Sequence, residues 1–143
     1  MRLKPWLLTS VVGVFALCGV ARADHIDFKA DLSGASEVPP VTTAGTGAAT
    51  ATLDTASKTL TWTVDYSGLS GPATAAHLHG PAAPGANAGV LVPLNGNLAT
   101  PIKGSATLTD AQISDLEAGE CYVNVHTAAN KPGEIRGQLV RTP

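Results

Sequence analysis

Short runs of alternating apolar and polar residues, separated by Gly, Pro and Asn turn signals, most constrain the fold of this chain. In residues 59–66, Leu60, Trp62 and Val64 fall on one face of an extended strand and threonines on the other. Similar runs occur at residues 25–32, 46–53, 75–80, 89–94, 102–108, 120–127 and 134–140. About eight short strands with turn signals every ~8–12 residues predict an all-β fold, an antiparallel sandwich or Greek-key barrel. We expect Trp62 to be a large residue of its core.

One segment, residues 109–118, has helical rather than strand periodicity. Thr109 and Gln112 have the spacing of a capping box, in which each side chain bonds the backbone N–H of the other residue. Gly119 follows at the position where a left-handed residue commonly ends a helix. The sequence therefore predicts one short helix in an otherwise β-rich domain.

The first 23 residues have the three parts of a secretory signal peptide. Arg2 and Lys4 precede an apolar run at residues 7–20, and a small-residue triplet, Ala-Arg-Ala, ends at position 23. We interpret residues 1–23 as a leader and residues 24–143 as a single domain. The protein is then expected to be secreted or periplasmic, with no membrane attachment after cleavage.

The alternatives are an uncleaved membrane anchor and a lipoprotein attached through Cys18. The apolar run is shorter than the ~20 residues that span a bilayer, and Leu17 is bulkier than the residue that precedes a lipidated cysteine. If the leader is removed, Cys121 is the remaining cysteine and no internal disulfide can form. Cys121 falls on the strand face assigned to the core, so a buried, inert thiol is favoured over a reactive or ligating one.

Charge and motif content exclude several classes of function. The full chain has a net charge of −2, and loss of the three basic leader residues brings the domain to about −5. Nucleic-acid binding requires a basic surface, so we do not expect a nucleic-acid partner. The sequence has no G-x-S-x-G motif, phosphate-binding loop or paired-carboxylate constellation, so hydrolase and kinase activities have no support.

Three histidines share a strand phase opposite to their apolar neighbours. His77 and His79 fall on one strand face and Leu78 on the other, and His126 is likewise opposite Val125. If Leu78 and Val125 face the core, the three imidazoles lie on the outer surface. If the two strands are neighbours, the rings converge on one point, which predicts a metal site.

Three neutral imidazoles suit copper or zinc. Copper is preferred, because affinity for a nitrogen site of this kind generally rises from zinc to copper. The alternative is structural: the histidines hydrogen-bond the adjoining loops, residues 81–89 and 128–133, and hold them in place.

Four other polar residues have both a functional and an ordinary interpretation. His25 follows the predicted cleavage site and can bind copper weakly with the free amine, although such a terminus is more often disordered. Glu134 and Arg136 share a strand face and can support the site or contact an anion, although a solvated pair is the commoner case. Asn124 lies in phase with His126 and is equally ambiguous.

Several motifs, taken together, resemble the CHRD domain. They are AHLHGPA, PIKGSATLTDAQISDLEAG, YVNVHTAAN and GEIRGQL, and they occur in the expected order. The CHRD domain is named for its repeats in chordin and also occurs singly in secreted bacterial proteins. The resemblance implies an all-β, immunoglobulin-like sandwich or barrel, and it implies much less about activity. The growth-factor antagonism of chordin is not carried over to a single domain.

The histidine pattern is also similar to the copper site of copper-zinc superoxide dismutases. Those enzymes place copper on a β-barrel with an H-x-H strand and a later V-H strand, which His77, His79 and His126 match. This chain has no histidine between His79 and His126 to bridge to a zinc ion. It also lacks a disulfide, so a complete dismutase site is not expected.

These observations predict a copper-binding protein that acts in storage, delivery or electron transfer. The first alternative is a superoxide-dismutase-like copper oxidoreductase with an open metal position. The second is a structural module without metal that binds a protein partner. A closed four-ligand site favours binding, whereas three ligands and an open position favour catalysis.

Overall fold

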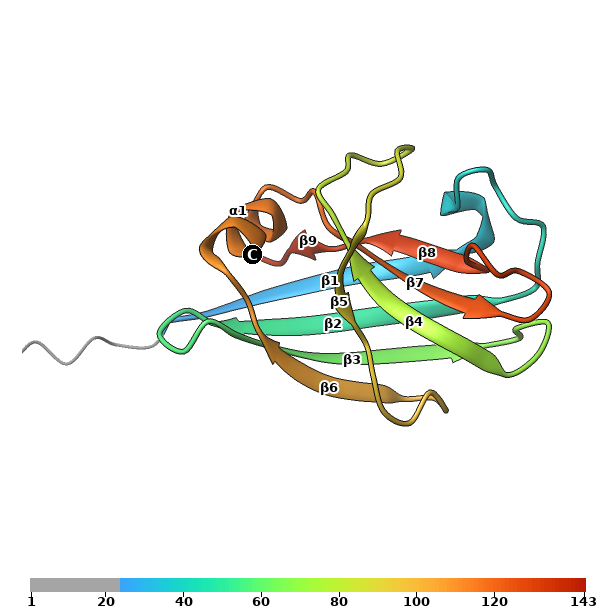
Figure 1. Cartoon of the computed structure of the whole chain (residues 1–143), viewed down its shortest axis with the longest axis horizontal. Coiled ribbons are helices and arrows are strands. Elements are labelled where there is room, and N and C mark those ends of the chain that lie inside the picture. The colour runs from blue at the N-terminus through green and yellow to red at the C-terminus, as the bar shows by residue number, and fades with distance from the viewer. Residues whose placement is uncertain (1–23) are drawn as a thin grey trace, which may run out of the picture.

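The computed structural model describes residues 24–143, and the predicted signal peptide, residues 1–23, lies outside the described residues (Figure 1). The elements are β1 (His25–Ser33), the 3-10 helix η1 (Gly34–Ser36), β2 (Thr46–Asp54), β3 (Thr59–Ser67), β4 (Ala73–His79), β5 (Val90–Pro93), β6 (Ile102–Thr107), α1 (Asp110–Glu117), β7 (Tyr122–Thr127), β8 (Ile135–Gln138) and β9 (Val140–Arg141). No helix within residues 24–143 has the length and apolarity needed to span a bilayer.

The strands form one nine-stranded antiparallel sheet in the order β5-β4-β7-β8-β1-β2-β3-β6, with β9 paired to β1. The sheet curls into a nearly closed barrel whose end strands are β5 and β6 (Figure 1). The predicted all-β class is therefore confirmed, with the sheet curled into a nearly closed barrel.

Long hairpins build one half of the barrel. Strand β1 pairs β2 from His25↔Asp54 to Ser33↔Thr46, and β2 pairs β3 over its whole length. Exposed and buried residues alternate along β1, because successive side chains point to opposite faces. The same alternation, carried by threonines on the solvent face, defines β3.

The core lies inside the barrel and contains the residues that the alternation assigned to it. Leu78 on β4, Trp62 on β3 and Val123 on β7 belong to one buried cluster. Trp62 is 6% exposed, as predicted. Its ring packs over Gly104, where a Cβ atom would lie 2.6 Å from Cζ2 of Trp62, so the absence of a side chain at this position makes room for the indole.

Helix α1 begins and ends as its sequence predicts. The Thr109 hydroxyl accepts a hydrogen bond from the Gln112 backbone N–H, and the Gln112 side chain accepts one from the Thr109 N–H. Gly119 has φ +74°, a conformation that glycine adopts without a steric penalty. Leu116 is buried and anchors the helix to the barrel.

The C-terminal strand differs from its prediction. Residues 134–140 were expected to form one strand, but the chain forms β8 and then a short β9. The backbone N–H of Leu139 donates to the carbonyl of Cys121, and the next residues turn to pair with β1. Cys121 itself is a free, fully buried thiol, as predicted.

Candidate metal centre

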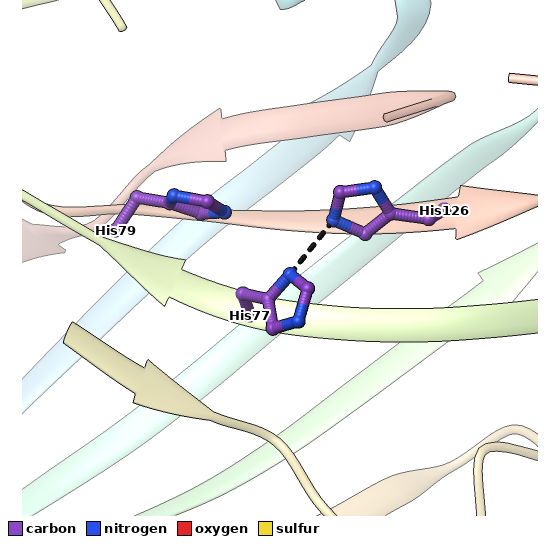
Figure 2. A group of neighbouring side chains, drawn as sticks. All are labelled: His77, His79 and His126. Carbon is purple, nitrogen blue, oxygen red and sulfur yellow. Dashed lines mark hydrogen bonds between the residues drawn. The ribbon is translucent and has the colours of Figure 1, made fainter. Parts of the chain in front are cut away.

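Strands β4 and β7 are antiparallel neighbours, which brings the three histidines onto the same face of the sheet. Ala75 pairs with His126, and His77 pairs with Asn124. Leu78 and Val125 point into the core on the opposite face. The three histidines share a sheet face, as their strand phase predicts, and the pairing of β4 with β7 places the rings together (Figure 2).

The histidine face is largely covered, so the prediction that the rings lie on the outer surface is wrong for His79 and His126. His79 is 9% exposed and His126 is 8% exposed, and only His77 is half-buried. The reason is that the loops at residues 80–89 and 128–133 fold over the rings. The core-facing pattern along a strand does not reveal such a cover.

His126 is held by one backbone carbonyl and faces a second histidine. Its Nδ1 lies 2.7 Å from the carbonyl oxygen of Lys131 and therefore donates to it. Its Nε2 lies 2.9 Å from Nδ1 of His77, the contact drawn in Figure 2. With its Nδ1 protonated, neutral His126 has a lone pair on Nε2, and His77 donates to it.

His79 has a similar support on its outer side. Its Nδ1 lies 3.0 Å from the carbonyl oxygen of Ala88, and its Nε2 lies 3.0 Å from Oδ1 of Asn124. Both oxygens are acceptors, so a neutral ring donates to only one of them. The Asn124 amide group donates to the carbonyl of Pro132, which directs Oδ1 toward His79. Asn124, ambiguous in the sequence, is thus a direct neighbour of the cluster.

Tyr122 links the cluster to the next strand. The His79 ring stacks on the Tyr122 ring with centroids 4.8 Å apart and an angle of 5° between planes. On β8, which flanks β7 on the other side, the Arg136 guanidinium carbon lies 3.4 Å from the centroid of the same ring. This contact is a cation–π interaction.

Burial favours the neutral form of two of the histidines. Burial lowers the pKa of His77, and the neighbouring His126 and His79 lower it further. Burial also lowers the pKa of His126 despite the opposing effect of its hydrogen bond to Lys131. The neutral ring is the form that binds a metal ion.

The three side chains can hold a metal ion. One ligand atom from each of His77, His79 and His126 lies within 4.8 Å of the others. His25 is not part of this group; it is the exposed first residue of β1, paired with Asp54, and is ordered as part of a strand.

The expectation of a solvated Glu134–Arg136 pair is wrong, because both side chains are buried. Glu134 accepts hydrogen bonds from four side chains and a backbone N–H, which come from Thr43, Ser70, Thr127 and Asn130. Arg136 donates to Asn87 and to the carbonyl of Ala86, in the loop over the histidines. These buried charges therefore fix the loops around the cluster.

Two residues near the cluster were missed in the sequence. Glu37, in a Pro-rich loop, is buried beside Asn124. Gly133 has φ +140°, and a Cβ atom there would lie 2.6 Å from Nδ2 of Asn124 and clash with the Glu37 carboxyl. A glycine next to a proline was the available signal for Gly133, whereas strand periodicity carries no signal for Glu37.

Comparison with known proteins identifies one family. A model of the CHRD domain matches residues 28–139, which covers most of the barrel. Comparisons with curated proteins and with solved structures find no match.

Proposed function

The chain belongs to the CHRD domain family, and we propose that this member binds a metal ion through His77, His79 and His126. The preferred metal is copper, and the function is copper storage, delivery or electron transfer. The protein acts after secretion, in the periplasm or outside the cell.

The observation that carries the proposal is the backbone support of two rings. The Nδ1 atoms of His79 and His126 each contact a backbone carbonyl, at 3.0 Å for Ala88 and 2.7 Å for Lys131. Metal-binding histidines commonly donate one ring N–H to such an acceptor, which orients the other nitrogen for the metal. The same support at two of three clustered rings favours a prepared ligand set.

The spacing of the ring nitrogens also fits a metal. The His77 Nδ1 and His126 Nε2 atoms are 2.9 Å apart. Two nitrogens bound to one ion at about 2.0–2.1 Å each are separated by roughly 3 Å. A metal at this point would replace the hydrogen bond between the rings and the contact of His79 with Asn124.

The ligand type supports copper over zinc. All three candidate ligands are imidazoles, and a site of this type generally has higher affinity for Cu²⁺ than for Zn²⁺. Cys121 is not available as a soft fourth ligand, because its side chain is fully buried in the core cluster. A blue-copper site is therefore not proposed.

The extracellular or periplasmic location rests on two arguments. The first 23 residues have the composition of a secretory leader. CHRD domains also occur in secreted proteins, and a three-histidine copper site is compatible with that setting.

Catalysis by a superoxide-dismutase-like copper centre is the second candidate. It is favoured by His77, which is half-buried while the other two rings are covered. An ion bound there would keep one side near solvent, as an open catalytic position requires. A third candidate is a structural role without metal, which the contacts of His79 and His126 with the two loops support.

Copper titration of the metal-free mature protein tests the proposal. We expect one copper per chain by elemental analysis after dialysis, and loss of that copper in a His77→Ala, His79→Ala, His126→Ala triple variant. His25→Ala is the matched control: it removes the weak copper site expected at the terminal amine and should leave the copper of the cluster in place, because His25 is exposed and outside the cluster. Equal copper content in the wild type and a folded triple variant would contradict the site. Superoxide turnover by the copper form would favour the catalytic candidate.

A further inference from the structure

A cavity of about 380 Å³ lies beside the histidine cluster and shares none of its three histidines. It is formed by η1 and the residues after it, by the loop that covers His79, and by β8. Its lining includes Ala35, Val38, Pro40 and Pro84, which provide apolar walls, together with Glu37 and Arg136. Small-molecule sites commonly have this size and this mixture of apolar walls and few polar groups.

Glu37 supplies a buried acidic group to the wall of this cavity. Its side chain is 6% exposed, and Oε1 has no well-formed hydrogen bond. Burial raises the pKa of Glu37 to about 7, although Arg136 and the Asn124 amide both act to lower it. The Asn124 amide is one hydrogen-bond partner of this carboxyl, and a positively charged donor in the cavity would further stabilise its ionised form.

Arg136 supplies a positive group to the same wall. It is 2% exposed and donates to Oδ1 of Asn87 and to the carbonyl of Ala86. A guanidinium carries five N–H donors, so these two contacts do not use them all. Glu37 and Arg136 influence one another electrostatically, yet they do not form an ion pair.

When Glu37 is ionised, the cavity wall holds two buried groups of opposite charge that are near each other but unpaired, and this favours a ligand that carries both charges. We propose that the cavity binds a small zwitterion of the amino-acid class, with its carboxylate toward Arg136 and its ammonium group toward Glu37. A simple anion would leave Glu37 without a donor, and a simple cation would leave the spare donors of Arg136 unmatched. The apolar walls suit an aliphatic side chain.

Ligand titration of the metal-free protein by ¹H–¹⁵N NMR tests this proposal. The probe is L-leucine, with N-acetyl-L-leucine and L-leucinamide as ligands that each lack one charge. We expect saturable shifts of the Glu37 and Gly85 amide signals with leucine. Both blocked ligands should bind at least about tenfold more weakly, because each loses one charged contact.

Two variants test separately the charge of Glu37 and the free volume of the cavity. Glu37→Gln keeps the shape of the side chain and should weaken leucine binding at least about tenfold, whereas Glu117→Gln, on exposed α1, should not. Ala35→Trp places a large side chain at an exposed position of the lining and should abolish binding with both charges intact.

Three results would overturn the proposal. They are no saturable shift with leucine, equal binding of leucine and either blocked ligand, and unchanged binding in a folded Glu37→Gln variant. If Glu37→Gln does not fold, unchanged binding in Ala35→Trp has the same consequence. The triple histidine variant should still bind leucine. The leucine result therefore does not depend on whether the three histidines bind copper.

Discussion

Nε2 of His126 lies 2.9 Å from Nδ1 of His77, although 49 residues separate them in the chain. The pairing of β4 with β7 creates this contact, and the loops over the two strands shield it. The two histidines differ in what else they hold. His126 also donates to the Lys131 carbonyl and so supports a loop, whereas the hydrogen bond of His77 is with the His126 ring.

This difference predicts unequal effects of two alanine variants. His77→Ala should lower copper affinity by at least about a hundredfold and change the free energy of unfolding by less than about 1 kcal/mol. His126→Ala should lower copper affinity similarly and also destabilise the protein by about 1–3 kcal/mol, because the Lys131 carbonyl loses its donor. Chelator competition measures the first effect and urea unfolding of the metal-free protein the second. Equal stability of the two variants would argue against the loop-supporting role of His126.

Copper binding should weaken in acid. A metal ion competes with protons for a neutral imidazole, so affinity falls once the pH drops below the pKa of the ligands. Because burial lowers the pKa of His77 and of His126, the loss should begin below the ordinary value of about 6.5. Affinity measured from pH 8 to 4 at constant ionic strength checks this. A steep loss between pH 8 and 7 would indicate ligands other than these two rings.

Cys121 should take no part in metal binding. Burial, then the nearby Asp115 and Glu120, raise the pKa of its thiol to about 12, so the thiol stays protonated at neutral pH. We expect Cys121→Ala to bind the same amount of copper as the wild type. The copper form of the wild type should also lack the intense thiolate absorption at about 600 nm that is typical of blue-copper sites. Such a band, lost in Cys121→Ala, would place the sulfur on the metal.

Glu134 should make a pH-dependent contribution to stability. Burial by itself would raise the pKa of Glu134, but hydrogen bonds from Ser70, Thr127 and Thr43 lower it to about 2. The ordinary value is 4.5, so the unfolded chain binds the proton first as the pH falls. The stabilisation is therefore complete above about pH 4.5 and is lost as the pH falls toward 2.

Glu134→Gln measures this contribution. At pH 7 the variant should be less stable than the wild type by about 3 kcal/mol, and the difference should shrink as the pH falls from 4.5 to 2. Glu117→Gln, an exposed change on α1, is the control and should alter stability by less than about 0.5 kcal/mol. A constant difference across this pH range would show that the charge of Glu134 is not its source.

The sequence by itself determined the faces of the strands and the ends of the helix. Leu78 and Val125 were assigned to the core and the three histidines to the other face, because side-chain direction along a strand follows from local backbone geometry. The capping residues of α1 are also neighbours in the chain. The CHRD motifs, which occur in the order expected for that domain, also indicated the all-β fold.

Only the tertiary structure decided which strands lie side by side and which polar residues become buried. Glu134 accepts a hydrogen bond from Thr43, which is 91 residues away. Arg136 bonds to Asn87 at a separation of 49 residues. Burial of His79 and the position of Glu37 likewise depend on loops that the curling of the sheet brings together. Periodicity carries no information about such contacts, because each depends on two segments that meet only after the sheet has formed.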